Sequence, residues 1–142
     1  MRALFDNNVV IDVLQSRAGF VEDSYAALHL VATGEVEGYI AASSLVDVWY
    51  ILKKSLGSDG ARMAIVDLTT ALSITDTRAT SVAEALLSPV DDFEDAVVAA
   101  CAKRIGADAI VTRDKHGFAK SAVPAMSPAE FVKAARTGGQ IG

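Results

Sequence analysis

Two aspartates along this chain stand where an α/β fold could place an acid for chemistry. Asp6 directly follows the short apolar run 2–5 (RALF), and Asp114 follows the apolar run 109–112 (AIVT). If both runs are strands, both carboxylates lie at the carboxyl ends of strands. Open α/β sheets bind their ligands just beyond that edge. Both aspartates could equally be simple turn-forming residues.

Three further aspartates lie near predicted helix starts. Asp92 and Asp95, in DDFEDAVVAACA, are three residues apart and share one face of a helix in its first turn. Either could only cap that helix and complement its dipole, which stabilises by about 0.5–2 kcal/mol. Asp47 lies in the apolar segment SLVDVWYIL, where an acid is costly to bury without a partner. Asp47 is therefore the hardest of these acids to explain as a structural residue.

The strongest argument for chemistry is a joint one. If the first and fourth strands are neighbours at the switch point of strand order, Asp6 and Asp114 converge, and two helix starts bring in Asp47 and Asp95. Several carboxylates in one pocket repel each other unless a hard divalent cation neutralises them. Mg²⁺ or Mn²⁺ held by a few carboxylates and waters is the usual solution. From spacing alone, a metal site and a set of caps and turns remain the two alternatives.

Apolar periodicity predicts strands and helices that alternate along the chain. The expected strands are 2–5, 38–42, 72–75, 109–112 and 122–126. The expected helices are 8–15, 20–33, 43–57, 59–71, 77–87, 92–104 and 128–136. This order predicts the α/β class, as a three-layer α/β/α sandwich around a central parallel sheet of about five strands. We expect one domain over 1–137 and a frayed tail over 138–142.

The composition is that of an ordinary soluble globular chain. Of 142 residues, 51% are hydrophobic and 22% charged, and no apolar run approaches the roughly 18 residues of a membrane span. The start MRALFDNN has no signal-peptide layout, and the single Cys101 is expected to be a buried small hydrophobe. We therefore expect a cytoplasmic protein. The net charge of −5 disfavours a broad basic surface for nucleic acid, but a metal-loaded nuclease site remains compatible with it.

The first half of the chain resembles the opening motifs of the PIN domain family, the nuclease fold of VapC-type toxins. LFDNNVVIDVL is similar to the Asp-x-Asn motif, here Asp6 and Asn8, with the common later acid at Asp12. AASSLVDVWYILKK resembles the second motif, with Asp47 in place of the commoner Glu. A second departure is Asn7, where the family usually has Thr or Ser.

The second half carries the other two motifs in the family's order. DFEDAVVAACA resembles the third motif, with Asp95 as its metal-binding acid and Asp92 as an accessory. ADAIVTRDKHGF resembles the fourth, giving Thr112 and Asp114. Each motif alone is weak, but four in order over nearly the whole chain are specific.

The resemblance implies endonucleolytic cleavage of RNA with Mg²⁺ or Mn²⁺. It implies that Asn8 and Thr112 orient ligands and waters, and that a metal is held by Asp6, Asp95 and Asp114 with Asp47 and Asp92 as further acids. It also implies a cognate antitoxin protein and a homodimer as partners. The first alternative is a non-catalytic PIN-like binding module with a drifted site, and the second is another acid-rich α/β enzyme. Asn8 argues against a haloacid-dehalogenase-like phosphatase, which needs a second Asp there.

Two groups of residues are open to more than one interpretation. Lysine and arginine side chains near the acids could contact RNA phosphates, namely Arg113, Lys115, Lys53 and Lys54, although the last two also suit a helix C-terminus. Large side chains at helical spacing are expected first of all in the core, with a partner interface as the alternative: Phe20, Tyr25, Trp49, Tyr50 and Leu52.

Overall fold

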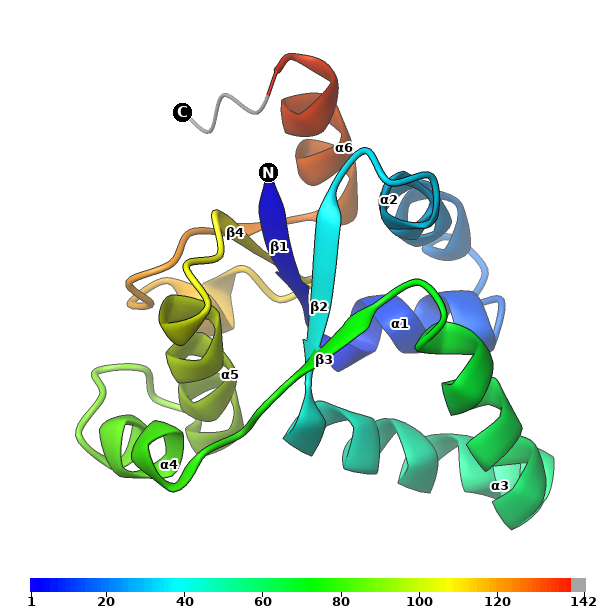
Figure 1. The fold of residues 1–142 in the computed structure, drawn as a ribbon, viewed down its shortest axis with the longest axis horizontal. Helices are drawn as coiled ribbons and strands as arrows, with labels where there is room; N and C mark the ends of the chain where they lie inside the picture. Colours follow the sequence, from blue (N-terminus) through cyan, green and yellow to red (C-terminus); the bar gives the residue numbers. More distant parts are fainter. Residues whose placement is uncertain (139–142) are drawn as a thin grey trace.

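The computed structural model describes residues 1–138 and shows a five-stranded parallel sheet flanked by helices (Figure 1). The expected tail falls almost entirely on 139–142, outside the described residues. The strands are β1 (Arg2–Phe5), β2 (Glu37–Ala41), β3 (Ser73–Thr75), β4 (Ala109–Val111) and β5 (Ala125–Met126). They run in the order β3-β2-β1-β4-β5, and every neighbouring pair is parallel. The predicted sheet is confirmed.

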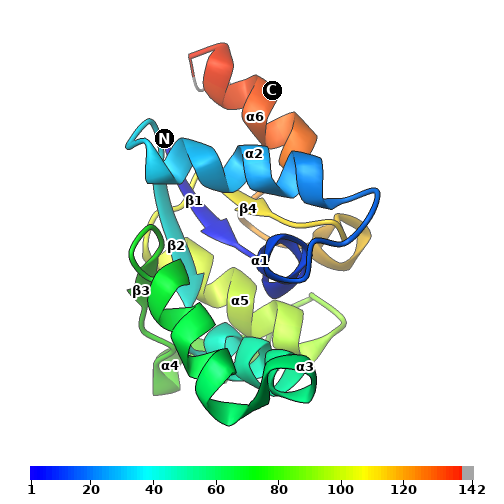
Figure 2. The same ribbon diagram turned by 90° about the vertical axis from the view of Figure 1, so that its right-hand side faces the viewer.

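Helices cover both faces of the sheet (Figures 1 and 2). They are α1 (Asn7–Leu14), α2 (Val21–Ala32), α3 (Ala42–Leu68), α4 (Ala79–Leu86), α5 (Phe93–Arg104), the 3₁₀ turn η1 (His116–Phe118) and α6 (Pro128–Arg136). The alternating side chains of β1 enter two separate cores: Ala3 and Phe5 pack with α1, α2, α3 and α6, while Leu4 packs with α4, α5 and η1. The predicted three-layer sandwich is therefore confirmed.

The two helices expected at 43–57 and 59–71 form one element with a sharp break. Gly57 has φ 73° and ψ 173°, and the helix resumes directly after it. Glycine suits this position because a side chain is disfavoured at positive φ. The second half ends at Leu68, three residues earlier than expected, and the chain then enters β3.

The core was only partly predictable from helical spacing. Leu52 is fully buried and Trp49 packs against the first core, as expected. The core interpretation is wrong for Phe20, Tyr25 and Tyr50, which are 45%, 56% and 60% exposed. Helical spacing fixes which residues share a face but leaves open whether that face meets the sheet or the solvent.

The topology creates a switch point between β1 and β4. The chain builds β2 and β3 on one side of β1, and β4 and β5 on the other. Phe5 is paired with Val111, so Asp6 and Thr112 follow at adjacent strand ends, and the Asp6 amide donates to the Val111 carbonyl at 2.9 Å. Cys101 is fully buried, as expected. Within 1–138, no helix combines the length and apolar character needed to cross a bilayer.

Candidate metal centre

Asp6 is the acid that the fold buries at the switch point. It is 4% exposed and forms the N-cap of α1, where its Oδ1 accepts from the Asn7 amide at 2.9 Å. Its Oδ2 accepts from Thr112 Oγ1 at 2.8 Å and from Asn8 Nδ2 at 3.3 Å. Burial raises the pKa of Asp6, and these hydrogen bonds partly offset that rise. The side chain is thus held in one orientation by neutral donors.

Thr112 connects the first and fourth motifs. Its Oγ1 donates to Asp6 and accepts from Asn8 Nδ2 at 3.3 Å and from the Asp114 amide at 3.0 Å. Asn8 also accepts, through Oδ1, the amide of Arg113 at 3.2 Å. Asn8 and Thr112 therefore fix the backbone after β4, an arrangement that suits the orienting role implied by the resemblance.

Asp114 and Asp95 meet around a glycine. Asp114 Oδ1 accepts the Gly117 amide at 3.2 Å. A Cβ added at Gly117 would lie 2.7 Å from Asp114 Oδ2 and 2.8 Å from Asp95 Oδ2, closer than real Cβ atoms come to other heavy atoms. Both carboxylate oxygens therefore border a space that stays open because residue 117 has no side chain.

The electrostatics around Asp95 mark the centre of the acid cluster. Burial raises the pKa of Asp95 to about 7, and the charges of Asp6, Asp92, Glu94 and Asp114 push it in the same direction. Asp92 is exposed and caps α5, because its Oδ1 accepts the Asp95 amide at 3.0 Å. The capping interpretation of Asp92 thus matches its geometry, and its charge still acts on Asp95.

Glu94 is an acid of this cluster that the sequence did not single out. Its pKa is raised by burial and then by the charges of Asp47, Asp6 and Asp92, and its Oε1 accepts from Asn7 Nδ2 at 3.4 Å. Glu94 is therefore close enough to the buried Asp6 and to half-buried Asp47 for both charges to act on it. The available signal was its place in the first turn of α5, beside a predicted ligand.

The nearby cations contact other groups of the protein in this structure. Arg113 Nε lies 2.6 Å from Asp12 Oδ2, and Lys115 Nζ lies 2.8 Å from Glu130 Oε1. Lys53 sits over the Trp49 ring at 5.0 Å. Contact of these three side chains with RNA phosphates stays a prediction.

The acid cluster fits a divalent cation in the chemistry of its donors. Its donors are hard carboxylate oxygens, burial and then the charges of neighbouring acids raise the pKa of Asp95, and Gly117 leaves space beside Asp95 and Asp114 open. Within 1–138, no three Asp, Glu, His or Cys side chains stand close enough, as they are, to ligate one ion. Binding would thus require the carboxylates to move toward a common point.

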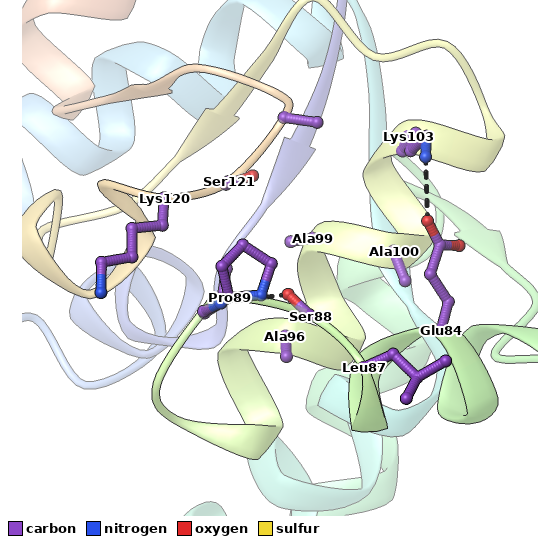
Figure 3. A pocket seen from close by; sticks show the side chains of 12 residues that line it. Glu84, Leu87, Ser88, Pro89, Ala96, Ala99, Ala100, Lys103, Lys120 and Ser121 are labelled. Atoms are coloured by element: carbon purple, nitrogen blue, oxygen red, sulfur yellow. Dashed lines mark hydrogen bonds and ion pairs between the residues drawn. The ribbon is translucent and has the colours of Figure 1, made fainter.

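Hollows in the protein surface lie elsewhere. One of about 360 Å³ lies on the far side of α5, where α4 ends and the segment after η1 passes (Figure 3). Ala96, Ala99 and Ala100 form its floor, and the ion pair of Lys103 with Glu84, at 3.0 Å, closes one end. None of the predicted site residues lines this hollow.

Fold and acid cluster together define an α/β protein with a carboxylate site at the sheet's switch point. A family model described as the PIN domain matches residues 2–116. The chain belongs to the PIN domain family, as the resemblance implied. No protein with a curated description matches it by sequence.

Solved structures show the same fold at low sequence identity. VapBC2 from Rickettsia felis, bound to a DNA fragment from its promoter, is 16% identical with a TM-score of 0.71 and coverage of 89% of this chain and 98% of that one. A toxin–antitoxin complex from Klebsiella pneumoniae is 22% identical, with a TM-score of 0.68 and coverages of 90% and 98%. VapC20 from Mycobacterium tuberculosis, a toxin that cleaves the sarcin-ricin loop, is 16% identical, with a TM-score of 0.65 and coverages of 82% and 93%.

Proposed function

We propose that this protein is a divalent-metal-dependent endoribonuclease that hydrolyses RNA phosphodiester bonds. One observation carries the proposal: Asp6, Asp95 and Asp114 gather at the switch point of a PIN-domain sheet, with Gly117 keeping the space between two of them open. Charge repulsion in such a cluster favours a bound cation over an empty site. Mg²⁺ or Mn²⁺ is the cation class that carboxylates of this kind select.

The roles follow from the contacts. Asp6, Asp95 and Asp114 would hold the metal, while Asp47, Asp92 and Glu94 would act on its waters from the margin. Such a metal, when bound, lowers the pKa of a nearby water and polarises the phosphodiester. Asn8 and Thr112 keep the ligands oriented, because they tie Asp6 to the backbone that carries Asp114.

Purified variants test the proposal directly. We expect Asp95→Asn and Asp114→Asn to retain the fold and to lose Mg²⁺-dependent cleavage of RNA by more than the roughly 10–100-fold that loss of an outer-shell partner costs. The matched control is Asp59→Asn, an exposed aspartate on α3, which should cleave like the wild type. Cleavage at unchanged rates in both site variants, or in EDTA, contradicts the proposal.

A non-catalytic PIN-like binding module is the second candidate. Asn7 and Asp47 favour it, because they replace the hydroxyl and the longer acid that the family usually carries. Calorimetric titration with Mn²⁺ separates the two candidates. Saturable binding that disappears in Asp95→Asn supports the nuclease, and no heat change and no thermal shift with Mn²⁺ supports the module.

We further propose that the nuclease is the cytoplasmic toxin of a toxin–antitoxin pair and a homodimer. The fold is shared with the VapBC and toxin–antitoxin structures above, and α3 exposes apolar side chains that a partner could cover: Val46, Tyr50, Met63 and Val66. An antitoxin-like protein encoded beside this one should co-purify with it and block RNA cleavage. Light scattering of the isolated chain tests the dimer.

A further inference from the structure

Asp12, which the proposed metal site does not use, is a buried acid with a built environment. It is fully buried, and its Oδ2 accepts from Arg113 Nε at 2.6 Å and from Ser24 Oγ at 3.1 Å. Its Oδ1 has no hydrogen-bond partner among the described residues, and Arg17 Nη1 lies 3.9 Å from this oxygen. A buried charge held mainly by one arginine makes that arginine's position critical.

Arg113 is attached to α1 at two points. Its backbone amide donates to Asn8 Oδ1 at 3.2 Å, and its side chain reaches Asp12. Asn8 and Asp12 are four residues apart, so they lie on one face of the same helix. The guanidinium also stacks on the Phe20 ring, 4.1 Å from its centroid. Arg113 is therefore held by its backbone amide and by its side chain.

We propose that Asp12 and Arg113 are positioning residues that set Asp114 in the metal centre without touching RNA or metal themselves. The N-cap of α1 carries Asp6 and its second turn carries Asp12, so one rigid helix fixes both Asp6 and, through Arg113, the segment of Asp114. A displacement of that segment would have to separate a buried ion pair, and the pair resists it. The inference rests on the proposed metal-dependent function.

The test compares Arg113→Met, the conservative Arg113→Lys and wild type. We expect Arg113→Met to weaken Mn²⁺ binding in calorimetry about tenfold, as loss of an outer-shell partner does, and Arg113→Lys to restore most of it. In RNA cleavage, kcat should fall while KM stays unchanged, because the side chain does not bind substrate. The control Arg2→Met removes an arginine that pairs with Glu37 at 2.8 Å and should leave Mn²⁺ binding unchanged.

Hydrogen exchange separates failure of this inference from failure of the proposed function. We expect amide exchange over 112–117 to accelerate at least about tenfold in Arg113→Met with β1 and β4 unchanged, whether or not Mn²⁺ binds. If the wild type binds no Mn²⁺, the proposed function fails. The exchange measurement still shows whether Arg113 holds the segment 112–117 in place.

Three results overturn the positioning role. They are wild-type Mn²⁺ affinity in Arg113→Met, unchanged exchange over 112–117, and a raised KM with a reduced salt dependence, which would place Arg113 on an RNA phosphate. If Arg113→Met does not fold, Asp12→Asn, which keeps the side-chain shape, is judged by the same measurements.

Discussion

The two buried aspartates of α1, Asp6 and Asp12, have opposite electrostatic surroundings. Asp12, on the second turn, is held by Arg113 at 2.6 Å and by Ser24. Asp6, at the N-cap of the same helix, is oriented by neutral donors and faces the charge of Asp114. Two acids six residues apart thus have different neighbours, although both are almost fully removed from water.

The difference between Asp6 and Asp12 shows how the fold distributes its positive charge. The arginine beside Asp114 turns away from the acid cluster and neutralises Asp12 instead. The cluster itself has no such partner, and burial, followed by the charges of the neighbouring acids, raises the pKa of Asp95 to about 7. The paired acid should therefore stabilise the native state, while the unpaired cluster should destabilise it until a cation binds.

The largest effect on stability is expected at the paired acid. Arg113→Met leaves Asp12 buried without its main partner, and breaking a buried pair this way costs about 3 kcal/mol. That corresponds to a Tm lower by about 6–12 °C for a chain of this size. Thermal unfolding measured by circular dichroism should show it, and the exposed pair Lys103–Glu84 supplies the control Lys103→Met, with a far smaller shift. Equal shifts of Tm in both variants would show that the buried pair matters no more than the exposed one.

A smaller effect is expected from filling the space between the unpaired acids. Gly117→Ala would place a methyl group 2.7 and 2.8 Å from oxygens of Asp114 and Asp95, so at least one carboxylate must move. We expect Mn²⁺ affinity to fall about tenfold in calorimetry, with little change in Tm. Gly60→Ala on α3 is the matched control and should bind Mn²⁺ like the wild type. Unaltered affinity in Gly117→Ala would place the metal away from this glycine.

Much of the fold was predictable because local patterns and topology rules agree. Short apolar runs and Gly57 marked the elements, and the parallel order of the sheet follows from their alternation. The 3₁₀ turn His116–Phe118 was not predicted. A turn of three residues is too short to show a hydrophobic period in the sequence. It depends on the hydrogen bond from the Gly117 amide to Asp114 and on burial of Phe118.

The candidate site was predictable where chemistry coincides with strand ends and helix starts, and not where it depends on distant partners. Asp6 and Asp114 could be placed together once their strands were expected to be neighbours. Arg113 and Asp12 are 101 positions apart, and no local sequence pattern indicates that they pair. Glu94 joins the cluster only because α5 turns it toward Asn7, a rotation that acid spacing alone does not fix.

Removing an unpaired acid should stabilise the metal-free protein. The folded pKa of Asp95, about 7, lies above its ordinary value, so the folded state holds this proton more tightly than the unfolded chain does. Stability is therefore lost as the pH rises from about 4 through 7, and Asp95→Asn should escape that loss. After allowance for solvent screening, we expect about 1 kcal/mol at pH 8, or about 2–4 °C in Tm.

Thermal unfolding of both proteins in EDTA, from pH 4 to pH 8, measures this difference. The two Tm curves should meet near pH 4 and separate as the pH rises, with the variant higher. Saturating Mn²⁺ should raise the Tm of the wild type and leave that of Asp95→Asn nearly unchanged. A variant less stable than wild type at pH 8 in EDTA would show that Asp95 is paired after all.

The smallest effect is expected at an acid that is paired but exposed. Glu130 lies 2.8 Å from Lys115 and accepts the Ser127 amide at 3.0 Å, contacts that lower its pKa to about 2 although both ionic side chains are half exposed. Because its folded pKa is depressed, its contribution is present above the ordinary pKa and is lost as the pH falls toward 2. Glu130→Gln should cost about 0.5 kcal/mol in urea unfolding at pH 7, and nothing at pH 2 or in 1 M salt. A loss of stability as large as that of Arg113→Met would contradict this prediction. It would mean that ion pairing alone, without burial, accounts for the difference between Asp6 and Asp12.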